Sequence, residues 1–370
     1  MSTRALWLLS AVLLVLVGLM LARRPAATSV ATPTVHAPQP ATGASVRVPA
    51  RPRLPAPQLP QRAGSNEPAL EAPATNTLAR LLRGEAIPKL TRAQLEAYLQ
   101  QNKRSAESLL AAARATDDLA WLREAAEKFP GDPQVQFDLA LRGETPEEKR
   151  QALAAFRQLA RDNPLGDYLS ALDHFKSGRA DDGVKDLMQA GGKTKLQDYT
   201  LDHMQNAEEA FLSAGHGPLE AKVAGTFGVV LPHLQSLRDL ATQMTELQKQ
   251  YAQSGDAASA QAVGQMGLNL AWQLESQPGR TLIAELVGMA IEKKFLAAQT
   301  PESAFGNDGR TVRDRLAELD AHRQAIHAVL PVQDLLGGLP EREALLYFDR
   351  VKVNGELDAL RWLKNKHGSP

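Results

Sequence analysis

The chain has 370 residues, with 42 basic and 42 acidic side chains and no cysteine. The zero net charge gives no support to a nucleic-acid partner, and the lack of cysteine excludes disulfides, thiolate metal sites and a cysteine nucleophile. The charge is unevenly distributed, because residues 1–62 carry seven arginines and no acid, which leaves 35 basic against 42 acidic residues in 63–370.

The N-terminal segment "ALWLLSAVLLVLVGLMLA", residues 5–22, contains no charged side chain. As a helix it would span roughly 27 Å, close to the ~30 Å of a bilayer's hydrocarbon core. A signal peptidase site needs small residues soon after the apolar run, but Met20 interrupts that pattern and the small triplet at 29–31 lies too far away. We expect residues 1–22 to form an uncleaved signal anchor; a cleaved signal peptide is the alternative.

A proline-rich stretch follows the apolar segment. Residues 25–73 hold 11 of the chain's 23 prolines, in runs such as "VPARPRLPAPQLPQR". Each proline fixes φ and lacks a backbone donor, so the stretch is predicted to be extended and polyproline-like. We interpret residues 23–76 as a disordered Pro/Ala-rich linker that carries the body away from the cytoplasmic membrane on its periplasmic side. A tail without a spacing role would have the same composition.

The body of the chain shows helical periodicity throughout. Beyond residue 77, apolar residues recur three and four positions apart between short Gly, Pro or Asp punctuation, and no alternating strand pattern competes. The predicted fold class is all-α. The expected helices are 91–102, 105–115, 117–129, 133–142, 146–162, 165–177, 180–190, 197–213, 218–230, 233–253, 256–275, 279–298, 311–329, 340–352 and 355–366.

Specific stop and start signals separate these helices. In "EKFPGDP", Pro130 ends one helix and Pro133 is placed to begin the next, and "ARDNPLGDY" repeats the device 31 residues later at Pro164. Thr145 precedes Pro146 and two glutamates, which is typical of an N-cap, a first helical position and an acidic first turn.

One helix pair has the pattern of a known repeat. In "LSALDHFKSGRADDGVKDLMQA", Gly178 stands at the turn, Gly183 at a small position of the second helix and Ala190 at its closing small position. This pattern resembles the helix–turn–helix unit of tetratricopeptide repeats. The resemblance covers about residues 91–195 and implies a tetratricopeptide-like array, an α-solenoid, over residues 77–195.

The resemblance has departures. Ser170-Ala171 replaces the usual large residue and glycine, and the spacing is 31 rather than the common 34 residues. Beyond this array we expect an antiparallel helical bundle with longer helices at 196–300 and C-terminal helices at 301–370. An anchor, a proline-rich linker and degenerate helical repeats together resemble helical-repeat proteins of the bacterial cell envelope.

The tetrad at residues 191–194, "GGKT", has the letters of a phosphate-binding loop. Such a loop needs a first glycine at the position of Leu187, and a strand before it rather than a helix. We interpret the glycines as the end of helix 180–190, with one of them in the left-handed conformation, and Lys193 and Lys195 as solvated. No nucleotide is expected.

The eight histidines are dispersed along the sequence. His322 and His327 are five apart and do not share a helix face, so surface or packing roles are expected. His203 lies near Asp198 and Asp202 in the sequence. These three residues would make at most a weak metal site, and a solvated helix face is the preferred interpretation.

Paired carboxylates at 208–209 and 181–182 are adjacent on helices, so they do not converge and are interpreted as surface charge. Two common serine-nucleophile patterns are also lacking. We expect no catalytic, cofactor-binding or metal-binding residue, no cofactor, and no enzymatic activity.

The leading functional prediction is a membrane-tethered helical-repeat scaffold that mediates protein–protein interaction in the cell envelope, since stacked helix pairs create extended surfaces. Its expected contacts are a protein or peptide partner and the membrane, the latter through the N-terminal helix, without nucleic acid or nucleotide. The alternatives are an envelope hydrolase or transferase whose site is not visible in local motifs, and a purely structural assembly subunit.

Overall fold

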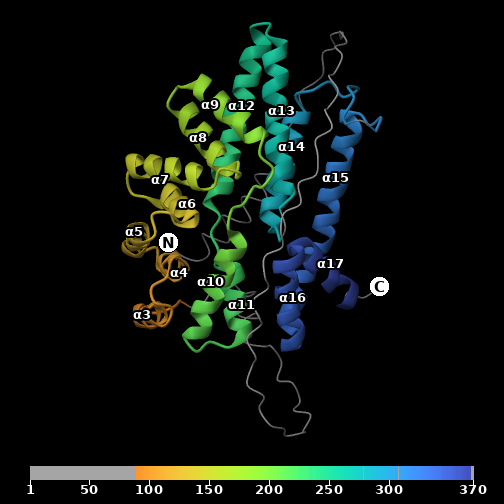
Figure 1. The fold of residues 1–370 in the computed structure, drawn as a ribbon. Helices are drawn as coiled ribbons and strands as arrows, with labels where there is room; N and C mark the ends of the chain where they lie inside the picture. The colour runs from red at the N-terminus through yellow and green to blue at the C-terminus, as the bar shows by residue number, and fades with distance from the viewer. Residues whose placement is uncertain (1–88, 278, 307, 368–370) are drawn as a thin grey trace, which may run out of the picture. The chain divides into compact units, whose positions relative to one another are not determined.

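The described part of the chain is built from α-helices joined by turns and loops, as Figure 1 shows. The computed structural model describes residues 89–277, 279–306 and 308–367. Within these ranges there is no β-strand, so the all-α prediction is confirmed for them. The elements are α3 (Arg92–Gln101), α4 (Ala106–Thr116), α5 (Leu119–Lys128), α6 (Pro133–Arg142), α7 (Pro146–Leu159), α8 (Leu165–Lys176), α9 (Ala180–Gly191), α10 (Thr200–Ser213), α11 (Pro218–Phe227), α12 (Pro232–Gln253), α13 (Ala257–Glu275), α14 (Leu282–Leu296), α15 (Val312–Val329), η1 (Leu330–Gly338), α16 (Glu341–Asn354) and α17 (Glu356–His367).

The predicted helices are all present, and their ends lie within three residues of the predicted ends. Helix α14 begins later than expected because Thr281 caps it, its hydroxyl accepting the Ala284 N–H at 3.3 Å. The 3-10 helix η1 was not predicted from the sequence. It is only nine residues long and carries a proline at its start and two glycines at its end, so it lacks an apolar repeat typical of an α-helix.

Side-chain caps, among them the predicted one at Thr145, explain why these helices begin where they do. Asp132 accepts the N–H groups of residues 134 and 135 at the start of α6, directly before Pro133. Thr145 accepts the Glu148 N–H at 3.1 Å at the start of α7. Thr311 and Asp314 form a capping box that begins α15. Each cap satisfies donors that the first helical turn leaves free.

Consecutive helices pack against each other in pairs along the chain. The pairs are α4 with α5, α6 with α7, α8 with α9, α10 with α11, α12 with α13, α13 with α14, and α16 with α17. In the pair α8–α9, Gly178 occupies the turn at φ +72°, and a Cβ on Gly183 would lie 2.8 Å from the ring of Phe175. The small residue at Gly183 therefore allows the close approach of α8 and α9, and the repeated packing is compatible with a helical-repeat fold.

The predicted left-handed glycine at the end of α9 is wrong. Helix α9 includes Gly191, and Gly192 has φ −81° and ψ −6°, a right-handed conformation. The helix closes instead through short-range bonds, in which Gly192 N donates to Gln189 O at 3.2 Å and Lys193 N donates to Ala190 O at 3.1 Å. This 3-10-type ending makes no demand on a glycine's conformational freedom.

Helices α10 and α11 join distant parts of the sequence (Figure 1). Helix α10 packs on α3 and α4, while α11 packs on α16. Phe211, Ala221 and Ala224 of this pair share one hydrophobic cluster with α3–α5. A larger cluster runs from Phe137 to Leu363 and includes the long helices α12–α14. The core therefore depends on contacts between segments more than a hundred residues apart.

The predicted anchor at 1–22 and linker at 23–76 lie outside the described residues. Within the described ranges, the search for a helix with the length and apolar character of a membrane span finds none. Helix α14 is an interior element, since ten of its 15 residues are buried.

Candidate functional site

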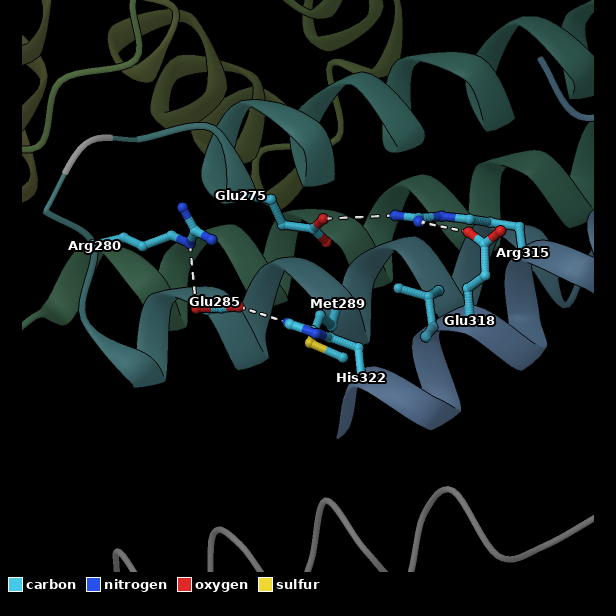
Figure 2. A pocket seen from close by; sticks show the side chains of 8 residues that line it. Glu275, Arg280, Glu285, Met289, Arg315, Glu318 and His322 are labelled. Atoms are coloured by element: carbon cyan, nitrogen blue, oxygen red, sulfur yellow. Dashed lines mark hydrogen bonds and ion pairs between the residues drawn. The ribbon is translucent and has the colours of Figure 1, made fainter. Parts of the chain in front are cut away.

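A pocket of about 210 Å³ lies between the C-terminal end of α13, the following turn, α14 and α15 (Figure 2). Its lining is strongly polar, with two apolar side chains, Met289 and Leu319, among the charged ones. The lining residues are Glu275, Arg280, Glu285, Met289, Arg315, Glu318, Leu319 and His322.

Local structure explains how these side chains converge. Glu285 and Met289 are four residues apart on α14, and Arg315 and His322 are seven apart on α15, so each pair shares one helix face. The turn before Arg280 depends on Gly279, which has φ +62° and where a Cβ would lie 2.6 Å from the backbone oxygen of Lys352. The pocket is therefore formed by side chains from three helices and the turn between two of them.

Arg315 binds the most deeply buried carboxylate beside the pocket. Its Nε and Nη2 atoms each donate to an oxygen of Glu292 at 2.8 Å, and Glu292 is 0% exposed. Trp272 adds an indole N–H bond to Glu292 at 3.1 Å. Arg315 also donates to Glu318 at 3.1 Å, so it joins α14 to its own helix. These charge-assisted bonds raise the pKa of Arg315 above its ordinary value.

Glu285 lies between two nitrogen groups, as Figure 2 shows. Arg280 Nε donates to one of its oxygens at 3.2 Å, and His322 Nε2 lies 2.7 Å from the other. Glu285 is 3% exposed, so these contacts provide the partners that a buried carboxylate requires.

Glu275 has no such partners. Its nearest cation is Arg315, whose Nη2 lies 3.8 Å from Oε2, and its Oε1 atom is buried without a hydrogen-bond partner among the described residues. Burial first, and then the negative charge of Glu292, raise the pKa of Glu275 to about 8. At neutral pH this carboxyl group therefore holds a proton.

The sequence-based interpretation of His322 missed its place in this pocket, while His327 is exposed on another face of α15 as expected. The local sequence contains no signal for the contact between His322 and Glu285, because the two residues are 37 positions apart. Only the packing of α15 on α14 brings them together.

The suggested metal site at His203 is not assembled. Asp198 instead contacts His233, with 3.1 Å between His233 Nε2 and Oδ2. His203 is buried, so the interpretation of a solvated helix face was wrong at this residue, and burial, followed by the charge of Arg114, lowers its pKa well below 6.5. Within the described ranges no group of three or more histidine and acidic side chains could hold a metal ion.

The "GGKT" segment, which has the letters of a phosphate-binding loop, has a structural role. Lys193 forms an ion pair with Asp167, which is 1% exposed, so the prediction that this lysine is solvated is wrong. Arg157 contacts the same carboxylate at 2.9 Å and reaches Asp186 at 2.6 Å. Lys195 is exposed, as predicted.

Among the paired carboxylates at 208–209 and 181–182, which were interpreted as surface charge, one joins helices. Glu208 is buried and contacts two lysines, Lys222 at 3.0 Å and Lys352. This ion pairing joins α10, α11 and α16. Glu209 is exposed as expected, and among the described residues Asp182 pairs only with Lys185 on its own helix. The prediction was wrong at Glu208 because the lysines come from distant helices.

Comparisons of the chain with protein-family models, with curated proteins and with solved structures found no match.

Proposed function

We propose that the chain is a membrane-tethered helical-repeat scaffold, with a tetratricopeptide-like array at 77–195, that binds a protein or peptide partner in the cell envelope. The observation that carries this proposal is the succession of packed helix pairs from α4 to α17. Arrays of this kind present long surfaces made of many helix faces, which suit extended protein partners.

Exposed apolar side chains on these surfaces give the proposal a place to be tested. Val230, Val353 and Met188 are 81%, 75% and 63% exposed, the highest values among the large apolar side chains of the described ranges. Scattered apolar residues are normal on protein surfaces, so the proposal requires that they contact a partner.

Site-specific photo-crosslinking in intact cells tests the scaffold function. A photoreactive amino acid at each of these three positions should give a discrete crosslink to a second protein, and the purified partner should bind the full chain with a measurable Kd. Matched positions at exposed polar residues, Glu147 and Lys185, serve as controls. Crosslinks only between copies of this chain would favour the structural assembly subunit, and no crosslink at any site would oppose both.

The pocket favours one second candidate, an envelope hydrolase or transferase. A carboxyl group with a raised pKa, Glu275, beside a second carboxyl group, Glu285, is the kind of pairing that acid and base catalysis of hydrolysis uses. A panel of ester, amide and glycoside substrates with the full chain and Glu275→Gln tests this candidate. Turnover that the substitution abolishes would support it, and turnover that both proteins share would point to a contaminant.

A further inference from the structure

The side chains around the pocket include more carboxylates than cations. Four carboxylates meet there, and they are Glu275, Glu285, Glu292 and Glu318. The arginines that contact them are Arg280, Arg310 and Arg315, and Arg310 also pairs with Asp308. Counting Asp308, five carboxylates therefore meet three guanidinium groups, so the cluster lacks at least one positive charge.

Neighbouring elements do not supply that charge. Lys293 of α14 is paired with Asp320 of α15 at 2.6 Å. At the start of α17, Glu356 accepts the Leu282 N–H at 2.8 Å and adds another acidic group, although burial raises its pKa. The missing positive charge is therefore not supplied by the helices around the pocket.

Glu275 is the carboxylate without a cation of its own. The single guanidinium near it already binds both oxygens of Glu292, and lies 3.8 Å from Glu275 Oε2. On its other side, Oε1 lies against Gly288, where an added Cβ would come within 3.4 Å. A proton now compensates the charge of Glu275, and a cation in the pocket could take over that role.

The space beside Glu275 suits a small organic cation. The pocket volume of about 210 Å³ is several times the ~30 Å³ that one water molecule occupies in the liquid. Met289 and Leu319 provide apolar wall, while the carboxylates provide acceptors for N–H donors. The carboxylates outnumber the guanidinium groups, which disfavours an anion, and the ligand geometry for a metal ion is lacking within the described ranges.

We infer that this pocket is a binding site for a small primary alkylammonium ion, whose ammonium group pairs with Glu275 and whose alkyl chain lies against Met289 and Leu319. Binding replaces one positive charge, the proton on Glu275, by another, the charge of the ammonium ion. The neutral carboxylic acid of Glu275 releases its proton to solvent as the ammonium ion enters, so no covalent bond other than that O–H is broken and no electron is transferred. This inference does not depend on the scaffold function.

Isothermal titration of the full-length protein with n-butylammonium chloride tests the inference. The titrations use two buffers without a primary amine, phosphate and HEPES, at constant ionic strength and pH 6.5, 7.5 and 8.5. We expect one site per chain and close to one proton released at pH 6.5. The affinity should rise by up to about tenfold per pH unit below the pKa of about 8 and then level off.

Matched variants and ligands make the test specific. Glu275→Gln is isosteric with the protonated acid, keeps the fold by circular dichroism, and should abolish both binding and proton release. Glu246→Gln removes an exposed carboxylate that pairs with Lys249 at 2.8 Å and should change nothing. Methylammonium should bind more weakly than n-butylammonium, by up to about fourfold per methylene removed.

Three results would overturn the inference. The first is the lack of saturable binding of n-butylammonium to the natural protein at pH 8.5. The second is equal binding by Glu275→Gln. The third is equal binding of tetramethylammonium or Mg²⁺, which would show a general counterion effect, because tetramethylammonium has the charge but no N–H donor.

Discussion

Arg315 and Glu292 form a two-point ion pair that joins α15 to α14, with both N–O distances at 2.8 Å. The Glu292 side chain is fully buried, whereas the Arg315 side chain keeps 22% of its surface exposed at the edge of the pocket. Helix α15 buries only four residues, Val312, Leu319, Ile326 and Val329. With so little apolar burial, the attachment of α15 relies on polar contacts more than that of the interior helix α14.

Replacing Arg315 by alanine should therefore destabilise the protein strongly. The change leaves Glu292 as a buried charge with only the Trp272 N–H bond, and breaking one partner of a buried pair costs about 3–5 kcal/mol. Urea unfolding followed by circular dichroism measures the loss. Arg313→Ala is the control, since Arg313 and its partner Glu302 are 68% and 63% exposed, and it should cost less than about 1 kcal/mol. Equal effects of the two substitutions would contradict the prediction.

Stability should fall as pH rises through neutrality because of Glu275. Its folded pKa of about 8 lies above the ordinary value near 4.5, so the folded state binds a proton that the unfolded state has already lost. The contribution is complete below the unfolded value and is lost as pH rises through about 8, by at most about 1.4 kcal/mol per pH unit.

The difference between the natural protein and Glu275→Gln isolates this effect from other titrating groups. Their free energies of unfolding should agree near pH 5, and the variant should be the more stable protein at pH 9. Denaturation curves at half-unit pH steps measure the difference. A constant difference across this range would show that Glu275 does not titrate as proposed.

The sequence predicted the helices because their signals are local. Asp132, Thr145 and Thr311 cap the helices that follow them, and apolar spacing identifies the rest. The pocket has no such signal. Glu275 and Arg315 are 40 positions apart, and either residue alone looks like ordinary surface charge on a helix. The packing of α13, α14 and α15 brings the two residues together. That packing depends on the shapes of whole helix surfaces, which a short stretch of sequence does not reveal.

Gly225→Ala tests the close packing of the pair α10–α11. A Cβ at Gly225 would lie 2.7 Å from the backbone oxygen of Met204 and 3.2 Å from the backbone nitrogen of Glu208, and a backbone cannot rotate away as a side chain does. We expect a loss of about 1–3 kcal/mol in thermal or urea unfolding, despite alanine's better helix propensity. Gly131→Ala has nothing within 4 Å of the new atom and should be nearly neutral. A neutral Gly225→Ala would mean that α10 and α11 pack less closely than described.

Two neighbouring lysines distinguish an ion-pair role from a nucleotide-binding role for the "GGKT" segment. Lys193→Ala removes one of two cations from buried Asp167, while Arg157 stays at 2.9 Å, so we expect a loss of about 1–3 kcal/mol. Lys195 is exposed, and Lys195→Ala should stay within about 0.5 kcal/mol of the natural protein. Adding millimolar ATP with Mg²⁺ should not raise the Tm of any of the three proteins, since a ligand raises Tm only by binding the folded state. An ATP-dependent rise that Lys193→Ala removes would restore the nucleotide interpretation, and equal stability of the two lysine variants would contradict the ion-pair role.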